Sequence, residues 1–89
     1  MFRLWGKMIK DNHLLKDTTI CIDDNSINRT KKVLQSLEEI CYEFDLGKPI
    51  WLEKNIKEFQ LHAKTRFHAD SFIEGINFDY LEIQVIEED

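Results

Sequence analysis

The sequence contains few of the residues that build phosphate-binding loops, metal sites or membrane spans. Its 89 residues include one proline and three isolated glycines, so it has no glycine-rich loop of the kind that holds a nucleotide phosphate. No stretch approaches the ~20 consecutive apolar residues of a membrane span. The two cysteines, Cys21 and Cys41, form no Cys-x-x-Cys pair. We therefore expect both to be free, buried thiols in a reducing compartment.

Positive charge is also scarce. The chain has 12 Lys and Arg residues against 17 Asp and Glu residues, a formal net charge of −5. Residues 1–22 hold four basic residues against two acidic ones (+2), and residues 23–89 hold eight against 15 (−7). An acidic chain without a basic stripe disfavours nucleic acid as a partner. Residues 1–7 lack the apolar core of a signal peptide, which together with the missing span predicts a cytoplasmic protein without membrane contact.

The composition is that of one folded domain. Hydrophobic residues make up 43% of the chain, and two Trp, two Tyr and six Phe are among its aromatic residues. This supply suffices for one modest core. The composition does not change abruptly along the chain, and no repeat of the length used by repeat proteins is present. Residues 1–89 are therefore predicted to form a single domain.

The run from Phe78 to Ile86 has the clearest strand pattern. Leu81, Ile83 and Val85 form one apolar face at the period of two that a strand requires. The opposite face mixes aromatic, apolar and polar side chains. A strand of this kind usually lies inside a sheet, with neighbours on both edges. We therefore predict that it is the central strand.

The first 22 residues predict a β-hairpin, in which two alternating runs flank a polar turn at residues 11–13. A bulged three-residue loop pairs Leu4 with Ile20, whereas a two-residue loop shifts this register by one. Because the buried face normally sets the register, we expect the three-residue loop, with Asn12 or His13 in the left-handed conformation.

The clearest helix is predicted from Arg29 or Thr30 to Leu46. Asn28 or Thr30 caps its start, and Gly47 takes the left-handed position after its end. Its apolar stripe comprises Val33, Leu34, Leu37, Ile40, Cys41 and Phe44.

Weaker elements follow. A second helix is predicted from Glu53 to Lys64, residues 65–68 are either a short strand or a loop, and one helical turn is expected at residues 71–74. The inner side of the second helix is predicted to comprise Ile56, Phe59, Gln60 and Ala63. The fold class is therefore α+β: an antiparallel sheet, built from the N-terminal hairpin and the central C-terminal strand, with the helices packed on one face.

No stretch carries a catalytic, metal-binding or cofactor-binding signature, so we assign no residue to any of these roles. His62 and His68 lack the helical spacing of a chelating pair. A small enzyme or ligand-binding domain with a site around His62, Arg66 and His68 is nevertheless the alternative to a binding module.

Four large side chains fall on the sheet face opposite the predicted core: Trp5, Ile9, Tyr80 and Ile86. Either a later helix covers this second face, or the face is left for a partner. Trp and Tyr are enriched where interfaces carry their binding energy. The pattern therefore favours a non-enzymatic protein-interaction module. Its partner is another protein or, in a homodimer, a second copy of the chain.

Two runs of the sequence also carry a resemblance. Residues 39–52 (EICYEFDLGKPIWL) and residues 78–89 (FDYLEIQVIEED) are similar to a family of short, uncharacterised proteins from anaerobic Gram-positive bacteria. The similarity covers nearly the whole chain. It implies a bacterial cytoplasmic protein, and it brings no activity, ligand or catalytic residue with it.

Overall fold

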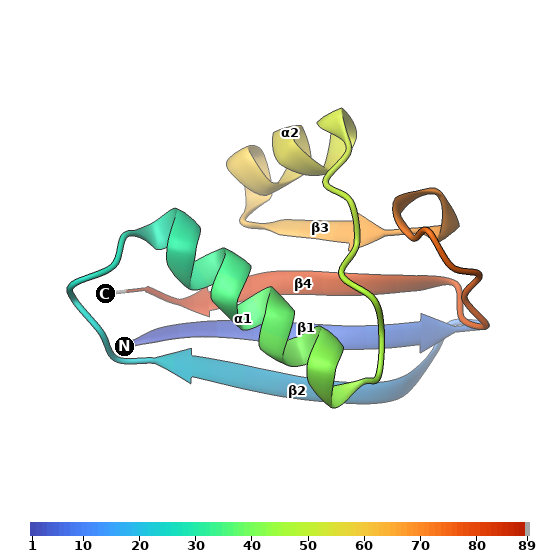
Figure 1. Cartoon of the computed structure of the whole chain (residues 1–89), viewed down its shortest axis with the longest axis horizontal. Helices are drawn as coiled ribbons and strands as arrows, with labels where there is room; N and C mark the ends of the chain where they lie inside the picture. The colour runs from blue at the N-terminus through green and yellow to red at the C-terminus, as the bar shows by residue number, and fades with distance from the viewer. Residues whose placement is uncertain (89) are drawn as a thin grey trace.

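Four strands form one antiparallel sheet, and two helices pack on one of its faces (Figure 1). The computed structural model describes residues 1–88. Its elements, in chain order, are β1 (Phe2–Lys10), β2 (His13–Ile22), α1 (Arg29–Glu43), α2 (Glu53–His62), β3 (Lys64–Phe67), the short 3-10 helix η1 (Ala69–Ser71) and β4 (Tyr80–Glu87). The predicted α+β class is confirmed.

The C-terminal strand is central, as its sequence pattern predicts. β4 lies between β1 and β3, and it pairs with both in antiparallel orientation. β3 lies in the segment for which the sequence predicts either a short strand or a loop. β4 begins at Tyr80 rather than at Phe78, whose ring instead packs edge-on against Phe72 in the core, with ring centroids 6.0 Å apart.

The register of the β1–β2 hairpin is confirmed away from its tip. Leu4 lies opposite Ile20, as the buried face requires. The register then shifts between Met8 and Ile9. The extra residue predicted for the loop is therefore absorbed inside the strands as a bulge.

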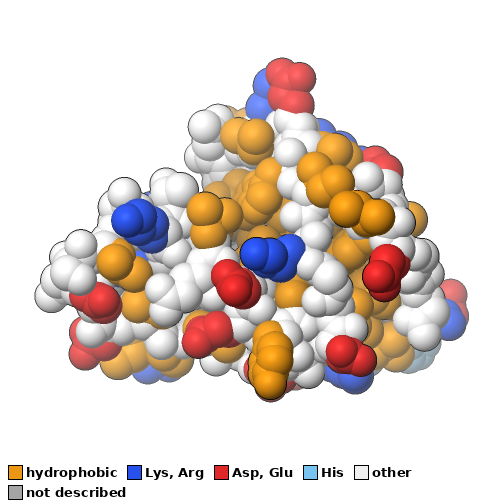
Figure 2. Space-filling model, viewed as in Figure 1, with side chains coloured by type: hydrophobic (Ala, Val, Ile, Leu, Met, Phe, Trp, Pro, Cys, Tyr) orange, Lys and Arg blue, Asp and Glu red, His pale blue; other side chains and the backbone are white. Residues whose placement is uncertain are grey.

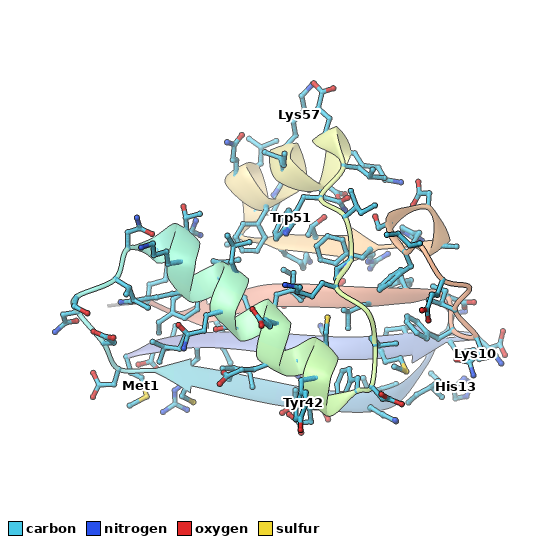
Figure 3. All side chains as sticks on the ribbon, viewed as in Figure 1. Met1, Lys10, His13, Tyr42, Trp51 and Lys57 are labelled. Carbon is cyan, nitrogen blue, oxygen red and sulfur yellow. The ribbon has the colours of Figure 1, made fainter. Side chains whose placement is uncertain are left out.

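The hairpin turn itself has two residues, not three. Lys10 pairs with His13 at the end of the hairpin (Figure 3), and the turn residues Asp11 and Asn12 both have positive φ, 51° and 63°. Two consecutive left-handed residues are the mark of a type I′ turn, whose twist matches that of the flanking strands. Asn12 is left-handed as expected, whereas His13 belongs to the strand.

The core fills the space between the sheet and α1, which crosses the sheet in Figure 1. Gly6 of β1 allows this helix to approach closely, because a Cβ atom at Gly6 would lie 2.8 Å from two carbon atoms of Ile40. The buried hydrophobic residues are Phe2, Leu4, Met8, Ile22, Val33, Leu37, Ile40, Cys41, Phe44, Phe59, Phe67, Phe78, Leu81 and Ile83.

Helix α1 starts at the predicted cap and ends earlier than predicted. The side chain of Asn28 caps its first turn. The helix stops before Leu46, whose N–H donates to the Cys41 carbonyl at 2.8 Å. This bond needs a left-handed residue, and Asp45 (φ 56°) supplies it in place of Gly47.

The buried side of α2 differs from the prediction. Phe59 is buried as expected, but Ile56 and Gln60 are exposed, and Asn55 is fully buried. The helix ends at His62, and Ala63 takes a left-handed conformation with φ 54°. The predicted helical turn at residues 71–74 is replaced by η1, which lies closer to β3.

Hydrogen bonding explains why a polar residue lies on the inner side of α2. The Asn55 side chain accepts from the Leu52 N–H at 3.0 Å and donates to Thr65 Oγ1 at 3.0 Å and to the Arg66 carbonyl at 2.9 Å. Because buried polar groups need such partners, Asn55 fixes α2 to β3. An apolar residue here would leave these backbone groups unpaired.

Candidate functional site: the open face of the sheet

One face of the sheet is left without a helix in the part of the chain that the structure describes. Both helices pack over the face that carries Leu4, Leu81 and Ile83. Side chains of the opposite register positions form a second surface, which we call the open face. Its residues are Arg3, Trp5, Lys7 and Ile9 of β1, Asp17, Thr19 and Cys21 of β2, Lys64 and Arg66 of β3, and Tyr80, Glu82 and Gln84 of β4.

Glu82 lies at the centre of the open face and holds together three strands. It is only 5% exposed, and its two carboxylate oxygens contact Lys7 Nζ at 2.5 Å and Arg66 Nε at 2.9 Å. Burial, the largest influence, raises the pKa of Glu82. The hydrogen bonds and positive charges of Lys7 and Arg66 outweigh it and hold the pKa below its ordinary value of 4.5. Glu82 is therefore a structural anion, ionised at neutral pH.

Two aromatic rings flank this charge cluster, and cations hold both of them. Lys7 Nζ lies 4.0 Å from the ring centroid of Trp5, whose indole N–H donates to Asp17 Oδ2 at 2.9 Å. The Arg66 guanidinium lies 4.6 Å from the ring centroid of Tyr80. Cation–π contacts of this length are attractive. Both rings therefore stand in fixed positions on a half-exposed surface.

The rest of the open face is polar at one end and apolar at the other. At the polar end, Arg3 Nε forms a salt bridge with Glu87 at 3.1 Å. At the other end, Ile9 lies opposite both Leu14 and Tyr80. The acids on this surface are already paired, so a partner would meet aromatic rings, aliphatic side chains and the cations that hold them.

The structure brings together three of the four residues predicted to bind a partner. Trp5, Ile9 and Tyr80 lie on the open face, which no later helix of the described residues covers. Ile86 is 47% exposed, but the β1–β4 register shifts between Arg3 and Leu4, and Ile86 has no partner there. The alternation on which the prediction relied is therefore interrupted at this residue.

The three residues of the alternative site do not converge. Arg66 and His68 both approach the Tyr80 ring, the latter with ring centroids 5.4 Å apart. His62 is exposed at the end of α2, and within residues 1–88 no hydrogen bond, ion pair or ring contact joins it to Arg66 or His68. Within residues 1–88, no group of three or more His, Cys, Asp or Glu side chains is arranged to hold a metal ion.

Both cysteines are free, as expected, but only one is buried. Burial raises the pKa of the Cys41 thiol to about 11, which keeps it protonated and unreactive. Cys21 is exposed on the open face, so its predicted burial is wrong. It lies on an edge strand opposite Arg3, and no helix among the described residues packs over it.

Sequence reasoning missed the charge cluster beneath the aromatic rings. Glu82 stands between Leu81 and Ile83 in a strand, an alternation that marks it as facing away from the core. Its two cations come from β1 and β3, far away in the sequence. The hairpin register places Lys7 opposite Asp17, but only the pairing with β4 reveals the link to Glu82.

We compared the chain with known protein families, curated proteins and solved structures. No family model, curated protein or solved structure matches the chain. Among residues 1–88, no helix has the length and apolar character needed to cross a membrane.

Proposed function

We propose that this protein is a non-enzymatic protein-interaction module that binds its partner through the open face. One observation carries the proposal: Trp5 and Tyr80 stand on a helix-free sheet surface, each held in place by a cation. Rigid, half-exposed aromatic side chains lose little conformational entropy on binding, and they dominate the energy of many interfaces. The bacterial cytoplasmic setting implied by the resemblance is part of this proposal.

The charges of the open face favour a protein over a nucleic acid. Arg3, Lys7 and Arg66 each have a carboxylate partner, and the whole chain has a formal net charge of −5. A row of phosphates needs several unneutralised cations along its path. A protein surface with apolar side chains and scattered acceptors fits the rings and the cations at lower electrostatic cost.

The proposal is tested by capture with matched variants. Immobilised wild type, Trp5→Ala, Tyr80→Ala and Leu61→Ala are exposed to bacterial extract, and bound proteins are identified by mass spectrometry. Leu61 is the control, because it is 77% exposed and lies on α2, which packs on the other face. We expect a partner that wild type and Leu61→Ala retain and that both open-face variants lose.

Self-association is measured in parallel by sedimentation velocity. A wild-type dimer that Trp5→Ala dissociates would identify the partner as a second copy of the chain and support the same surface. Equal capture by all four proteins, with wild type monomeric, would contradict the proposal.

A further inference from the structure

β2 is an edge strand whose outer side has no neighbour in the described chain. The sheet order β2-β1-β4-β3 gives it a partner only on the β1 side. It has 10 residues, against four in the other edge strand, β3. Beyond the bulge, its register with β1 is regular from Lys16 to Ile22. The outward N–H and C=O groups of this stretch therefore form a template for a further strand.

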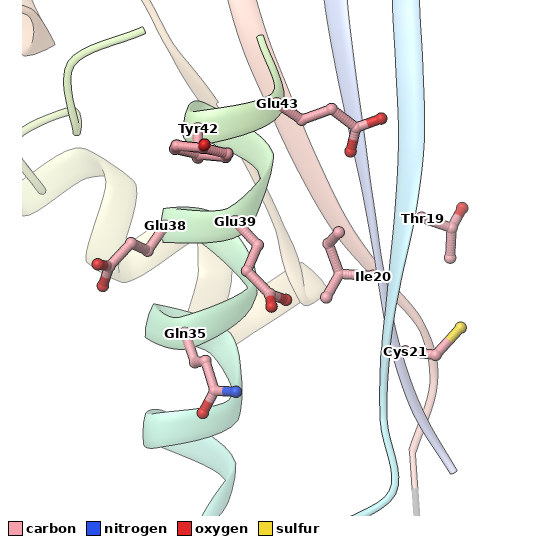
Figure 4. Close-up of a pocket in the computed structure, with 8 residues that line it drawn as sticks. All are labelled: Thr19, Ile20, Cys21, Gln35, Glu38, Glu39, Tyr42 and Glu43. Carbon is pink, nitrogen blue, oxygen red and sulfur yellow. The ribbon is translucent and has the colours of Figure 1, made fainter. Parts of the chain in front are cut away.

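A groove of about 860 Å³ lies between this strand and α1 (Figure 4). In the close-up, Ile20 points from β2 toward the helix, whereas Thr19 and Cys21 point to the opposite side of the sheet. The helix wall of the groove consists of Gln35, Glu38, Glu39, Tyr42 and Glu43. Acidic side chains on this wall stand out in the space-filling view as well (Figure 2).

The carboxylates of the helix wall are poorly neutralised. Glu43 accepts a hydrogen bond from Thr18 Oγ1 at 2.9 Å, which draws its carboxylate toward β2. Glu38 meets Lys48 only at 4.0 Å, with both side chains exposed. Within residues 1–88, no salt bridge includes Glu39 or Glu43. A cation that entered the groove from the β2 side would therefore find acceptors without a competing ion pair.

We propose that an extended basic peptide segment binds here as a fifth strand on the outer edge of β2. Its backbone would pair with β2 at the ~4.8 Å spacing of neighbouring strands. Its side chains on the helix side would then lie next to Ile20, within reach of Glu39 and Glu43 for Lys or Arg. The backbone supplies the docking geometry, and the carboxylates select positive charge and speed the encounter.

Charge also argues against a second copy of this chain on the same edge. Antiparallel pairing of β2 with itself requires a two-fold axis perpendicular to the sheet, which keeps both α1 helices on one side. The acidic walls carrying Glu39 and Glu43 would then face each other across the new strand pair. Like charges so placed disfavour the self-pairing, whereas they attract a basic strand.

The test uses a capped heptapeptide that alternates Lys and Val, titrated into the ¹⁵N-labelled protein. We expect amide shift changes concentrated on residues 17–22 and an affinity that falls with added salt. The double variant Glu39→Gln/Glu43→Gln should bind at least tenfold more weakly, while the control Glu53→Gln/Glu74→Gln binds nearly as wild type. Trp5→Ala should leave peptide binding unchanged, which separates this edge from the open face.

A second peptide decides whether strand pairing takes place. The same heptapeptide with alternate N-methylated amides keeps its charge but cannot complete a strand ladder, so we expect it to lose binding. Equal binding of both peptides would show that no strand pairing takes place. Equal weakening in both double variants would show that binding reflects only the net negative charge of the protein. Either result would overturn the proposal. A wild-type dimer with its interface mapped to β2 would overturn it as well.

Discussion

The two faces of the sheet are held by different forces. On the covered face, Leu4, Leu81 and Ile83 are fully buried under helices. On the open face, Lys7 and Arg66 both bind Glu82, which links three strands. Burying one large aliphatic side chain contributes about 1.5–3 kcal/mol, whereas a surface ion pair contributes about 0–1 kcal/mol and a more buried one must first offset the desolvation of its charges. The covered face therefore stabilises the fold, and the open face is free to differ in composition for another purpose.

Truncation in the covered face should have the largest effect on stability. Leu37 is buried on α1, and Leu37→Ala should lower the unfolding free energy by ~2–5 kcal/mol, as large-to-small core changes do. Leu34→Ala is the matched control, because Leu34 lies on the same helix but is 48% exposed. Chemical denaturation of both variants checks the difference. A change at Leu37 within about 0.5 kcal/mol, typical of surface sites, would mean that α1 buries another side.

The close approach of α1 to β1 predicts a smaller loss. Gly6→Ala places a methyl group 2.8 Å from the Ile40 side chain, and overpacking of this kind costs about 1–3 kcal/mol. Gly47→Ala and Gly75→Ala are the controls, since an added Cβ meets nothing within 4 Å at either position. Thermal unfolding of the three variants makes the comparison. Equal melting temperatures for all three would contradict the packing described.

The smallest stability change is expected from the open face. Glu82→Gln keeps the shape of the side chain and an oxygen that can accept from Lys7, and the half-exposed Arg66 regains water. We therefore expect a loss of about 1–2 kcal/mol at neutral pH, between the values typical of exposed and of buried ion pairs. The folded-state pKa of Glu82 is depressed, so its contribution is present above the ordinary value of 4.5 and is lost as pH falls through the folded pKa. Wild type and variant should therefore converge in acid. Denaturation curves between pH 7 and pH 2 test this; a constant gap across that range would contradict it.

The elements best predicted from the sequence are those set by one buried face. The alternation of Leu81, Ile83 and Val85 located the central strand, and the need to bury Leu4 with Ile20 fixed most of the hairpin register. The two-residue turn is not predictable from the register, because a bulge inside the strands compensates for the shorter loop. The inner side of α2 is not predictable from hydrophobicity either, because Asn55 is buried to make hydrogen bonds with backbone groups of two other segments.

The candidate site was predictable only in part, for a related reason. Alternation placed Trp5, Ile9 and Tyr80 on one surface, since each needs only its own strand. Ile86 lies where the register with β1 shifts and has no partner there, so alternation alone does not place it. The contacts that hold Trp5 and Tyr80 depend on which strands are neighbours, and non-local pairing of this kind leaves no local pattern in the sequence.

The most direct test of the division between the faces is to measure both the binding affinity and the unfolding free energy of one variant, Trp5→Ala. Its affinity for the captured partner, or its dimer dissociation constant, is measured beside its unfolding free energy, with Leu37→Ala as the reference for a core change. The account predicts binding at least tenfold weaker than wild type, with a loss of stability well below that of Leu37→Ala. Unchanged binding together with a core-sized loss of stability would show that Trp5 serves the fold, and would contradict the account.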